Sequence, residues 1–298
     1  DATMTVETFD HRRCALGEGP HYDAGTDRVF WVDILGARVR WRGVGNPDDT
    51  GGFDTGAHIG AAVPTTGGGL VLCLPDRLVL RSASGDLTEL ARLPHHGDPG
   101  LRSNDAKADP AGRLWHGTMA YAVTPGAGAL YLLPPGGRHP EPVLTDLTIA
   151  NGLGWSPDAA TMYHVDSPTG RVDAYEVDPA TGRPGRRRTF ATVVAAGSTG
   201  PTGAVVPDGL CVDADGGVWV AVWGGGVVHR YLPSGRLERT VTLPTPLVTS
   251  CAFAGPELDL LIVTTAADTL TDDAAAGRTY QYRPGDVTGR PCDRYIES

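Results

Sequence analysis

Short runs of hydrophobic residues recur along this chain, and each is followed within a few residues by a second run of similar character. The first run of each pair lies in one of six ranges: Arg28–Ile34, Gly69–Leu74, Arg113–Met119, Thr161–Asp166, Gly217–Trp223 and Leu258–Thr264. Within the first range, Val29 and Trp31 alternate with Phe30 and Val32, so both faces are largely apolar. A strand that is apolar on both faces is typical of a sheet packed between two other sheets.

The segment ahead of each first run starts at a position that recurs along the whole chain. These six positions are Glu18, Gly60, Asn104, Asn151, Asp208 and Ser250. Successive positions are separated by 42, 44, 47, 57 and 42 residues. A repeat of this length with several strands in each unit indicates the blades of a β-propeller. We therefore predict an all-β, six-bladed β-propeller formed by residues 1–298 as one domain, in which the N-terminal run Met4–Phe9 completes the last blade.

The charge balance and the apolar pattern narrow the classes of partner. A net charge of −10, from 25 basic and 35 acidic residues, argues against nucleic acid, whose binding proteins neutralise phosphates with clustered Lys and Arg. The one basic run, Arg186–Arg188, lies in the string TGRPGRRR, which predicts a solvated loop. No segment is apolar over the length of a membrane span, and the N-terminus lacks the apolar run of a signal peptide. We expect neither a nucleic-acid nor a membrane partner.

The five cysteines are scattered and never form a C-x-x-C pair. This usage predicts reduced thiols and a cytoplasmic protein. Three of them, Cys73, Cys211 and Cys251, lie in apolar strand contexts, where we expect them to pack rather than react. Nothing in the pattern specifies an oligomeric state.

Four of the six recurring positions carry polar groups that can bind a cation: Glu18, Asn104, Asn151 and Asp208. Equivalent positions in a radial fold converge on the axis, so these side chains should meet there. Two carboxylates in a narrow tunnel would repel each other, and a divalent cation would relieve that repulsion while the amide carbonyls supply further oxygen ligands. An oxygen-rich set suits Ca²⁺, Mg²⁺ or Mn²⁺ and tolerates Zn²⁺ or Fe²⁺. Any one of these residues alone could simply begin a turn, but their common register favours a metal site with room for water and substrate.

Two further features bear on this predicted site. Arg102 precedes Asn104 by two residues, so its guanidinium should lie on the same side and could hold a substrate oxygen. The alternative for this side chain is an ion pair with Asp105 or Asp109. The interval from Asn151 to Asp208 is the longest, and its strings TGRPGRRR and AAGSTGPTG predict a loop over one face.

Histidines inside the predicted strands are a separate case. His116 and His164 both lie in the middle of an apolar run. A histidine in such a position packs in the core more often than it binds a metal, so we do not include either in the metal set.

Five strings carry a resemblance to a known family. They are CALGEGPHYD, RSNDAKADPAGRLWHGTM, IANGLGWSPD, VPDGLCVDADGGVWVA and TSCAF, in this order between about Cys14 and Thr265. Together they resemble the senescence-marker-protein/gluconolactonase family, the regucalcin-like lactonases. The resemblance implies a six-bladed propeller with one divalent metal at its axis and a small-molecule sugar lactone as substrate.

The resemblance also implies roles for particular residues. The family's metal-binding Glu, Asn and Asp fall on Glu18, Asn151 and Asp208, and its substrate-contacting Arg and Asn fall on Arg102 and Asn104. One position departs from the family pattern: after the string GTMA, where several members have a substrate-contacting Glu, this chain has a tyrosine at position 121. The departure leaves the metal set intact and indicates a different sugar specificity.

Our hypothesis from the sequence is metal-dependent hydrolysis of a pentono- or hexonolactone to the aldonic acid, with Asp208 as general base and Tyr121 in contact with substrate. A serine nucleophile is not indicated, because no G-x-S-x-G string is present. Two alternatives stay open. One is an organophosphate or aryl-ester hydrolase on the same scaffold, where relatives usually add a second, structural calcium deep in the tunnel. The other is a non-catalytic calcium-binding propeller, since this fold serves unrelated functions.

Overall fold

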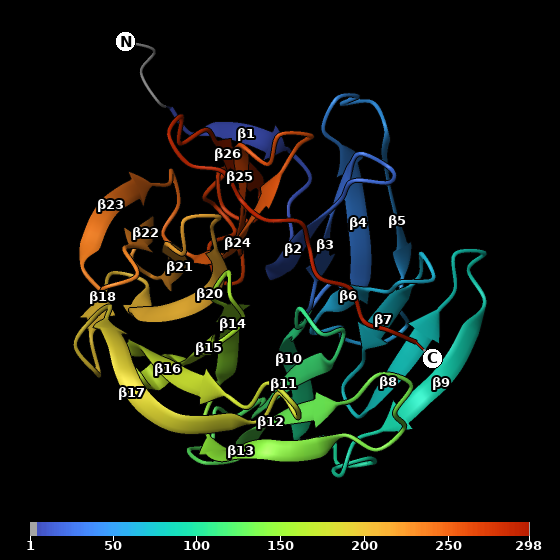
Figure 1. Cartoon of the computed structure of the whole chain (residues 1–298). Helices are drawn as coiled ribbons and strands as arrows, with labels where there is room; N and C mark the ends of the chain where they lie inside the picture. The colour runs from blue at the N-terminus through green and yellow to red at the C-terminus, as the bar shows by residue number, and fades with distance from the viewer. Residues whose placement is uncertain (1–4, 298) are drawn as a thin grey trace.

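The chain folds as a ring of six β-sheets around a central axis. The computed structural model describes residues 5–297, and each of the six sheets has four antiparallel strands (Figure 1). The only helix within that range is a short 3₁₀ turn, η1 (Ser167–Thr169). This confirms the prediction of an all-β, six-bladed propeller. No helix in residues 5–297 is long and apolar enough to cross a membrane.

Each blade is one sheet whose strands follow in chain order from the axis outward. The first three blades are β2 (Gly17–Asp23), β3 (Arg28–Asp33), β4 (Arg38–Gly43), β5 (Thr50–Asp54); β6 (Ala62–Pro64), β7 (Leu70–Cys73), β8 (Arg77–Arg81), β9 (Leu87–Arg92); and β10 (Leu101–Ala108), β11 (Leu114–Ala120), β12 (Gly128–Leu133), β13 (Glu141–Leu147). The next two are β14 (Ala150–Trp155), β15 (Thr161–Asp166), β16 (Arg171–Val177), β17 (Pro184–Thr192); and β20 (Val206–Val212), β21 (Val218–Trp223), β22 (Val227–Tyr231), β23 (Leu237–Thr242).

The sixth blade joins the two ends of the chain. Its inner strands are β24 (Val248–Ala254), β25 (Leu260–Thr265) and β26 (Thr279–Tyr282), and its outer strand is β1 (Glu7–Asp10). β1 pairs antiparallel with β26, with Glu7 opposite Gln281 and Thr8 opposite Tyr280. The first residue of the predicted N-terminal run, Met4, lies outside the described residues. Pairing the two ends in one sheet removes an exposed edge and closes the ring.

Tryptophan side chains on the second strands of three blades lie in the core of the ring. Trp31, Trp115 and Trp219 are all fully buried. Two of them also hold the preceding turn, which sequence reasoning did not anticipate. Trp115 Nε1 donates to Asp109 Oδ2 at 3.0 Å, and Trp219 Nε1 donates to Asp213 Oδ2 at 2.9 Å.

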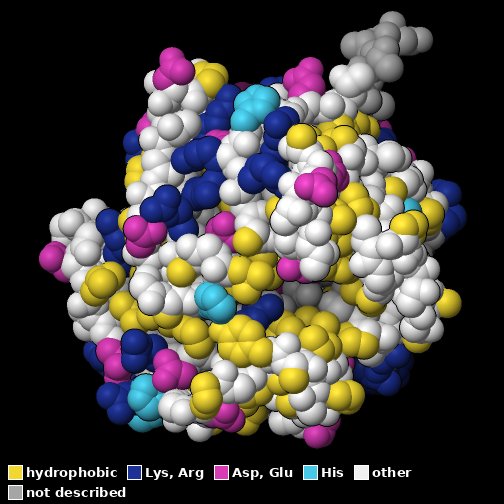
Figure 2. Space-filling model, turned by 180° about the vertical axis from the view of Figure 1, so that it is seen from behind, with side chains coloured by type: hydrophobic (Ala, Val, Ile, Leu, Met, Phe, Trp, Pro, Cys, Tyr) yellow, Lys and Arg dark blue, Asp and Glu magenta, His cyan; other side chains and the backbone are white. Residues whose placement is uncertain are grey.

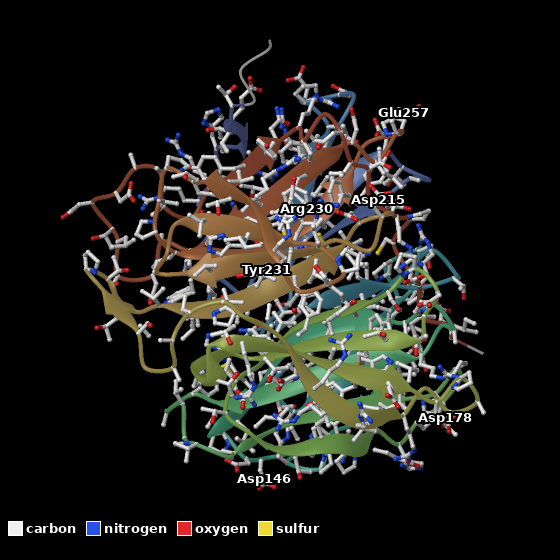
Figure 3. All side chains as sticks on the ribbon, turned by 60° about the vertical axis from the view of Figure 1, so that its left-hand side comes forward. Asp146, Asp178, Asp215, Arg230, Tyr231 and Glu257 are labelled. Atoms are coloured by element: carbon white, nitrogen blue, oxygen red, sulfur yellow. The ribbon has the colours of Figure 1, made fainter. Side chains whose placement is uncertain are left out.

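The fifth blade shows how such a carboxylate is satisfied. Arg230 Nε donates to Asp213 Oδ2 at 2.7 Å, and both side chains are buried. Figure 3 shows Arg230 and Tyr231 within the body of the ring, whereas Asp178 and Glu257 lie at its edge. The carboxylate of Asp213 thus accepts hydrogen bonds from both Arg230 and Trp219. A buried charge is tolerated when it is paired and hydrogen-bonded in this way.

The prediction of a long loop after Asn151 is wrong in part. The string TGRPGRRR enters β17, the outer strand of the fourth blade, so Arg186–Arg188 are exposed on a strand and not in a loop. Arg187 Nη1 pairs with Asp173 Oδ2 at 3.3 Å across the sheet. Only residues 193–205 connect this blade to the next, and they contain a small hairpin of β18 (Thr199–Gly200) and β19 (Gly203–Ala204).

The segment after β26 crosses one face of the ring and contacts blades far from its own (Figure 1). It bonds the fifth blade through Ala214 N to Thr288 O at 2.9 Å. Farther along, Tyr295 N donates to Pro64 O at 2.9 Å, and its fully buried ring packs in a core cluster of the second and third blades. This C-terminal strap therefore covers the end of the tunnel opposite to the end where the inner strands begin.

Candidate metal centre

An irregularity in the β-ladder occurs where the predicted site residues lie. In five of the six blades the pairing between the inner strand and the next strand shifts at the recurring position, between Glu18/His21, Ser103/Ala106, Ala150/Leu153, Pro207/Leu210 and Val248/Ser250. A β-bulge re-aims the side chain at that point and releases it from regular alternation. The second blade, whose recurring position is Gly60, has a regular ladder from Ala62 to Pro64. Bulges therefore accompany every polar recurring position.

A glycine follows each of the three predicted metal ligands, and close approach of neighbouring strands explains it. A Cβ on Gly152, after Asn151, would lie 2.6 Å from the carbonyl oxygen of Asp208 in the next blade. Gly19, after Glu18, adopts a positive φ of 53°, a conformation that favours glycine. The recurring Glu-Gly, Asn-Gly and Asp-Gly pairs thus let the inner strands meet near the axis.

Three carboxyl groups are buried together in the tunnel. Glu18, Asp208 and Asp105 are 5%, 5% and 3% exposed. Burial raises the pKa of Glu18 and of Asp208 well above the ordinary values, and repulsion from neighbouring carboxylates, Asp208 on Glu18 and Asp105 on Asp208, raises them further. The pKa of Asp105 is also raised by burial, while the charge of Lys107 opposes that shift. The tunnel therefore brings together three acidic groups, and the charges of Lys107 on Asp105 and of Arg102 on Asp208 offset only part of the pKa increase.

The amide of Asn151 is oriented by its hydrogen bond. Its Nδ2 donates to Ser167 Oγ at 3.0 Å, which leaves Oδ1 buried without a hydrogen-bond partner. Asp208 Oδ1 is also buried and without a partner. Orphaned buried oxygens are costly unless a ligand satisfies them. Ser167 on η1, which the sequence did not reveal as part of the site, thus fixes which end of the amide faces the carboxylates.

These donors fit a hard divalent cation. Two carboxylates and a free amide oxygen are the ligand types that such ions prefer, and the cation would satisfy the orphaned oxygens and the like-charge repulsion together. Within residues 5–297 no group of three or more His, Cys, Asp or Glu side chains is arranged to hold a metal. A site with Glu18 and Asp208 therefore needs Asn151 as its third ligand. Both carboxylate oxygens of Asp105 are also buried without a hydrogen-bond partner.

Arg102 and Asn104 lie together beside this centre. Arg102 Nη1 donates to Asn104 Oδ1 at 2.9 Å and to Ser103 O at 3.0 Å. Asn104 Nδ2 in turn donates to Ala150 O at 2.9 Å, the residue before Asn151. The alternative ion pair of Arg102 with Asp105 or Asp109 is absent from the described residues.

Tyr121 covers the guanidinium from the open side. The Arg102 Cζ lies 5.7 Å from the centre of the Tyr121 ring, and Tyr121 is 41% exposed. Figure 2 shows the face opposite to the C-terminal strap, which is hollowed near its centre, with hydrophobic side chains, a histidine and a basic side chain around the hollow. Of the residues predicted to contact substrate, Tyr121 is thus the exposed one, whereas Arg102 and Asn104 are buried.

Lys107 lies deeper in the tunnel and is the only lysine among the 298 residues. Its Nζ donates to Leu153 O at 3.0 Å and also to Leu210 O. Below it, a cavity of about 120 Å³ extends to the C-terminal strap, with His21, Cys211, Arg290 and Asp293 among its lining residues. This cavity contains none of the predicted metal ligands, so it is a separate chamber behind the site.

The two strand histidines are core residues, in keeping with their omission from the metal set. His116 Nε2 lies 2.7 Å from Ser103 Oγ, and burial lowers its pKa to about 3. Burial lowers the pKa of His164 to about 4. Both imidazoles are therefore neutral at physiological pH.

Comparison with known proteins identifies the family of this chain. Residues 16–267 match the SMP-30/Gluconolactonase/LRE-like region. The chain belongs to the SMP-30/gluconolactonase family. All six predicted site residues lie within the matched range. Regucalcin of Xenopus laevis is 34% identical over 281 residues, covering 91% of this chain and 90% of that protein.

Other members of the SMP-30/gluconolactonase family are similar over nearly the whole chain. Pentonolactonase XacC of Haloferax volcanii is 35% identical over 289 residues, covering 96% of this chain and 92% of that protein. The crystal structure of a calcium-binding protein, regucalcin, from Agrobacterium tumefaciens superimposes with a TM-score of 0.88 at 30% identity, covering 98% of this chain and 97% of the other. Members of this family are named as sugar lactonases, which are hydrolases of ester bonds, and this chain is accordingly an enzyme of that class.

Proposed function

We propose that this protein hydrolyses a sugar lactone to the aldonic acid with the help of one divalent cation held by Glu18, Asn151 and Asp208. The observation that carries the proposal is the set of orphaned, buried oxygens on Asn151 and Asp208 beside the raised-pKa carboxyl of Glu18. Membership of a family that contains named sugar lactonases supports the choice of substrate class.

The protein's own side chains supply three functions in this reaction. Arg102 Nη1 donates to Asn104 and Ser103, and the remaining N–H groups of the guanidinium would orient the lactone's ring oxygens. Asn104 is fixed by bonds at both ends of its amide and so contributes a preorganised edge to the pocket. Tyr121 closes the outer side over Arg102.

Hydrolysis needs a base, an electrophilic carbonyl and a proton for the departing ring oxygen. The bound cation would supply the Lewis acidity that polarises the carbonyl. Asp208 takes a proton from the attacking water as the new carbon–oxygen bond forms. The ring carbon–oxygen bond then breaks, and the proton held by Asp208 passes to the leaving alkoxide, giving the open-chain acid.

A second metal deep in the tunnel, the mark of the organophosphatase alternative, is disfavoured by Lys107. Its ammonium group already donates to carbonyls of the fourth and fifth blades, Leu153 O and Leu210 O. A fixed positive charge at this depth repels a further cation. The geometry therefore favours a single-metal lactonase over a two-metal hydrolase.

The proposal is tested by a pH-indicator assay on protein stripped with chelator and re-supplied singly with Mg²⁺, Ca²⁺, Mn²⁺, Zn²⁺ or Fe²⁺. Freshly made xylono-, arabinono- and gluconolactone serve as substrates. Acid release above the spontaneous rate, restored by a cation, supports the proposal. Folded protein that accelerates no lactone with any of these ions would refute it.

Two variants separate the roles. Asp208→Ala should remove most turnover, because it deletes both the base and a ligand. Arg102→Ala should chiefly raise KM, because it deletes a contact made to substrate before the chemical step. Unchanged turnover in Asp208→Ala would exclude the assigned base.

A further inference from the structure

A histidine that the sequence did not single out contacts Tyr121 at the entrance. The Nδ1 atom of His58 lies 2.7 Å from the Tyr121 hydroxyl, and the two ring centres are 5.6 Å apart with planes tilted by 58°. His58 lies between β5 and β6, at the junction of the first and second blades, whereas Tyr121 follows β11 of the third blade. The contact therefore spans the second blade.

The second blade has a short strand connection at this face, so a contact between the neighbouring blades can pass over it. Its β7–β8 connection is only residues 74–76, closed by Leu74 N donating to Arg77 O at 3.0 Å. The corresponding β11–β12 connection of the third blade covers residues 121–127. His58 and Tyr121 meet above the short turn and form a wall on this side of the entrance.

The wall is held from both sides. Thr55 Oγ1 donates to Ala57 O at 2.7 Å and Gly60 N donates to Cys73 O at 2.9 Å, which fix the chain before and after His58. On the other side, the Tyr121 ring lies over Arg102, which donates to Asn104. A line of contacts thus runs from His58 through Tyr121 and Arg102 to the edge of the metal centre.

The chemistry of the wall complements that of Arg102. A guanidinium only donates hydrogen bonds, whereas a neutral imidazole bonded to a phenol can present one donor and one acceptor in either tautomer. The pair can therefore bind a hydroxyl group as donor or as acceptor. Its two tilted rings also offer an apolar corner to the C–H face of a small ring. No carboxylate belongs to this wall.

We propose that His58, together with Tyr121, is a specificity-determining element that reads a ring hydroxyl of the lactone and so selects polyhydroxylated lactones over unsubstituted ones. This inference rests on the proposed lactonase function. His58 acts on substrate through its free Nε2 and through the position it gives to Tyr121.

The test compares two substrates that share the lactone group and differ in ring hydroxyls, D-xylono-1,4-lactone and γ-butyrolactone. In His58→Ala the ratio of their kcat/KM values should fall about three- to tenfold, the worth of one neutral hydrogen bond, through a higher KM for the xylonolactone. His58→Asn, whose amide can replace the Nδ1 contact, should recover part of the ratio. Tyr121→Phe combined with His58→Ala should lose less than the product of the two single losses, because each single variant already removes the contact that the two side chains share.

The matched control is His229→Ala. The Nδ1 atom of His229 lies 2.9 Å from Thr240 Oγ1, and its ring lies 6.0 Å from that of Tyr231, so it has the same kinds of contact on an outer strand of the fifth blade. This variant should leave the ratio unchanged. Affinity for the activating cation, titrated without substrate, should be the same in all variants, because His58 does not belong to the ligand set.

Two results would overturn the inference while leaving the function intact: a substrate ratio in His58→Ala equal to that of the wild type, or an equal loss on both lactones. The second result would mean that His58 only supports the fold of the entrance. Wild-type protein that opens neither lactone with any cation would instead refute the proposed function, and the inference with it.

Discussion

The charge of Asp208 should lower the stability of the metal-free protein but strengthen metal binding. The variant Asp208→Asn tests both effects. The side chain is 5% exposed and lies with Glu18 and Asp105 in a tunnel. Burial raises the pKa of all three carboxyls, and repulsion from neighbouring carboxylates raises those of Glu18 and Asp208 further. Asparagine keeps the shape and removes the charge. One unit of pKa displacement corresponds to about 1.4 kcal/mol. We therefore expect metal-free Asp208→Asn to be more stable than the metal-free wild type by about 1 to 2 kcal/mol, or about 2 to 8 °C in Tm.

The stability gained in metal-free Asp208→Asn should increase as the pH is raised. Because the folded-state pKa of Asp208 is raised above its unfolded value, its contribution to stability is fully present below the unfolded pKa and is lost as pH rises through the folded one. The wild type and Asp208→Asn should therefore be nearly equal below about pH 3, where the carboxyl is protonated in both the folded and the unfolded state. Their difference should grow as pH is raised toward 8.

A bound cation should make the wild type more stable than Asp208→Asn. At a cation concentration one hundred times its Kd, the wild type should gain about 2.7 kcal/mol, and Asp208→Asn, with one ligand charge lost, should gain much less. The assay is chemical denaturation at pH 5 and pH 8, each with chelator and with excess cation. A metal-free Asp208→Asn that is less stable than the wild type at pH 8 would refute the reasoning, as would an equal gain from metal in both proteins.

Two other substitutions test how the tunnel and the strap are held. Lys107→Met should destabilise the protein by about 3 kcal/mol in urea titration, because it leaves Asp105 without its nearest cation and the carbonyls of Leu153 and Leu210 without their donor; a loss below about 1 kcal/mol would mean that this ammonium is not needed. Tyr295→Ala should cost about 3 to 5 kcal/mol, because the ring is fully buried under the strap, whereas Ile296→Ala, at a side chain 36% exposed, should be nearly neutral in the same titration; equal effects would contradict the anchoring role of Tyr295.

The architecture and the axial meeting of polar residues could be predicted because both depend on period. A repeated strand pattern at blade spacing determines how many sheets form, and equivalent positions in a ring share one radius whatever the contacts between blades are. The repeat marked Glu18, Asn104, Asn151 and Asp208 as equivalent positions, and the family resemblance reduced the metal set to Glu18, Asn151 and Asp208. The shifts in their ladders were not anticipated.

The features that the sequence did not reveal are contacts between residues distant in the chain and a strand with one solvent-exposed face. Ser167 orients Asn151 from a 3₁₀ turn, and His58 reaches Tyr121 across a whole blade, so no local pattern marks either. The string TGRPGRRR was misread as a loop because an outer strand has one solvated face and little apolar alternation. Proline at the first position of such an edge strand is compatible with the sheet, since its missing N–H belongs to no ladder bond there.

The tunnel shows why the metal centre and the lysine belong together. Asp105 raises the pKa of Glu18 and Asp208 by charge repulsion, and the ammonium of Lys107 lowers the pKa of Asp105 against the effect of burial. Without Lys107, Asp105 would add a further unpaired charge behind Glu18 and Asp208, and the tunnel would hold more negative charge than one cation neutralises. The ammonium of Lys107 offsets part of the charge of this third carboxylate. In the proposed function, the divalent cation would then have to balance only Glu18 and Asp208, the two carboxylates assigned as its ligands.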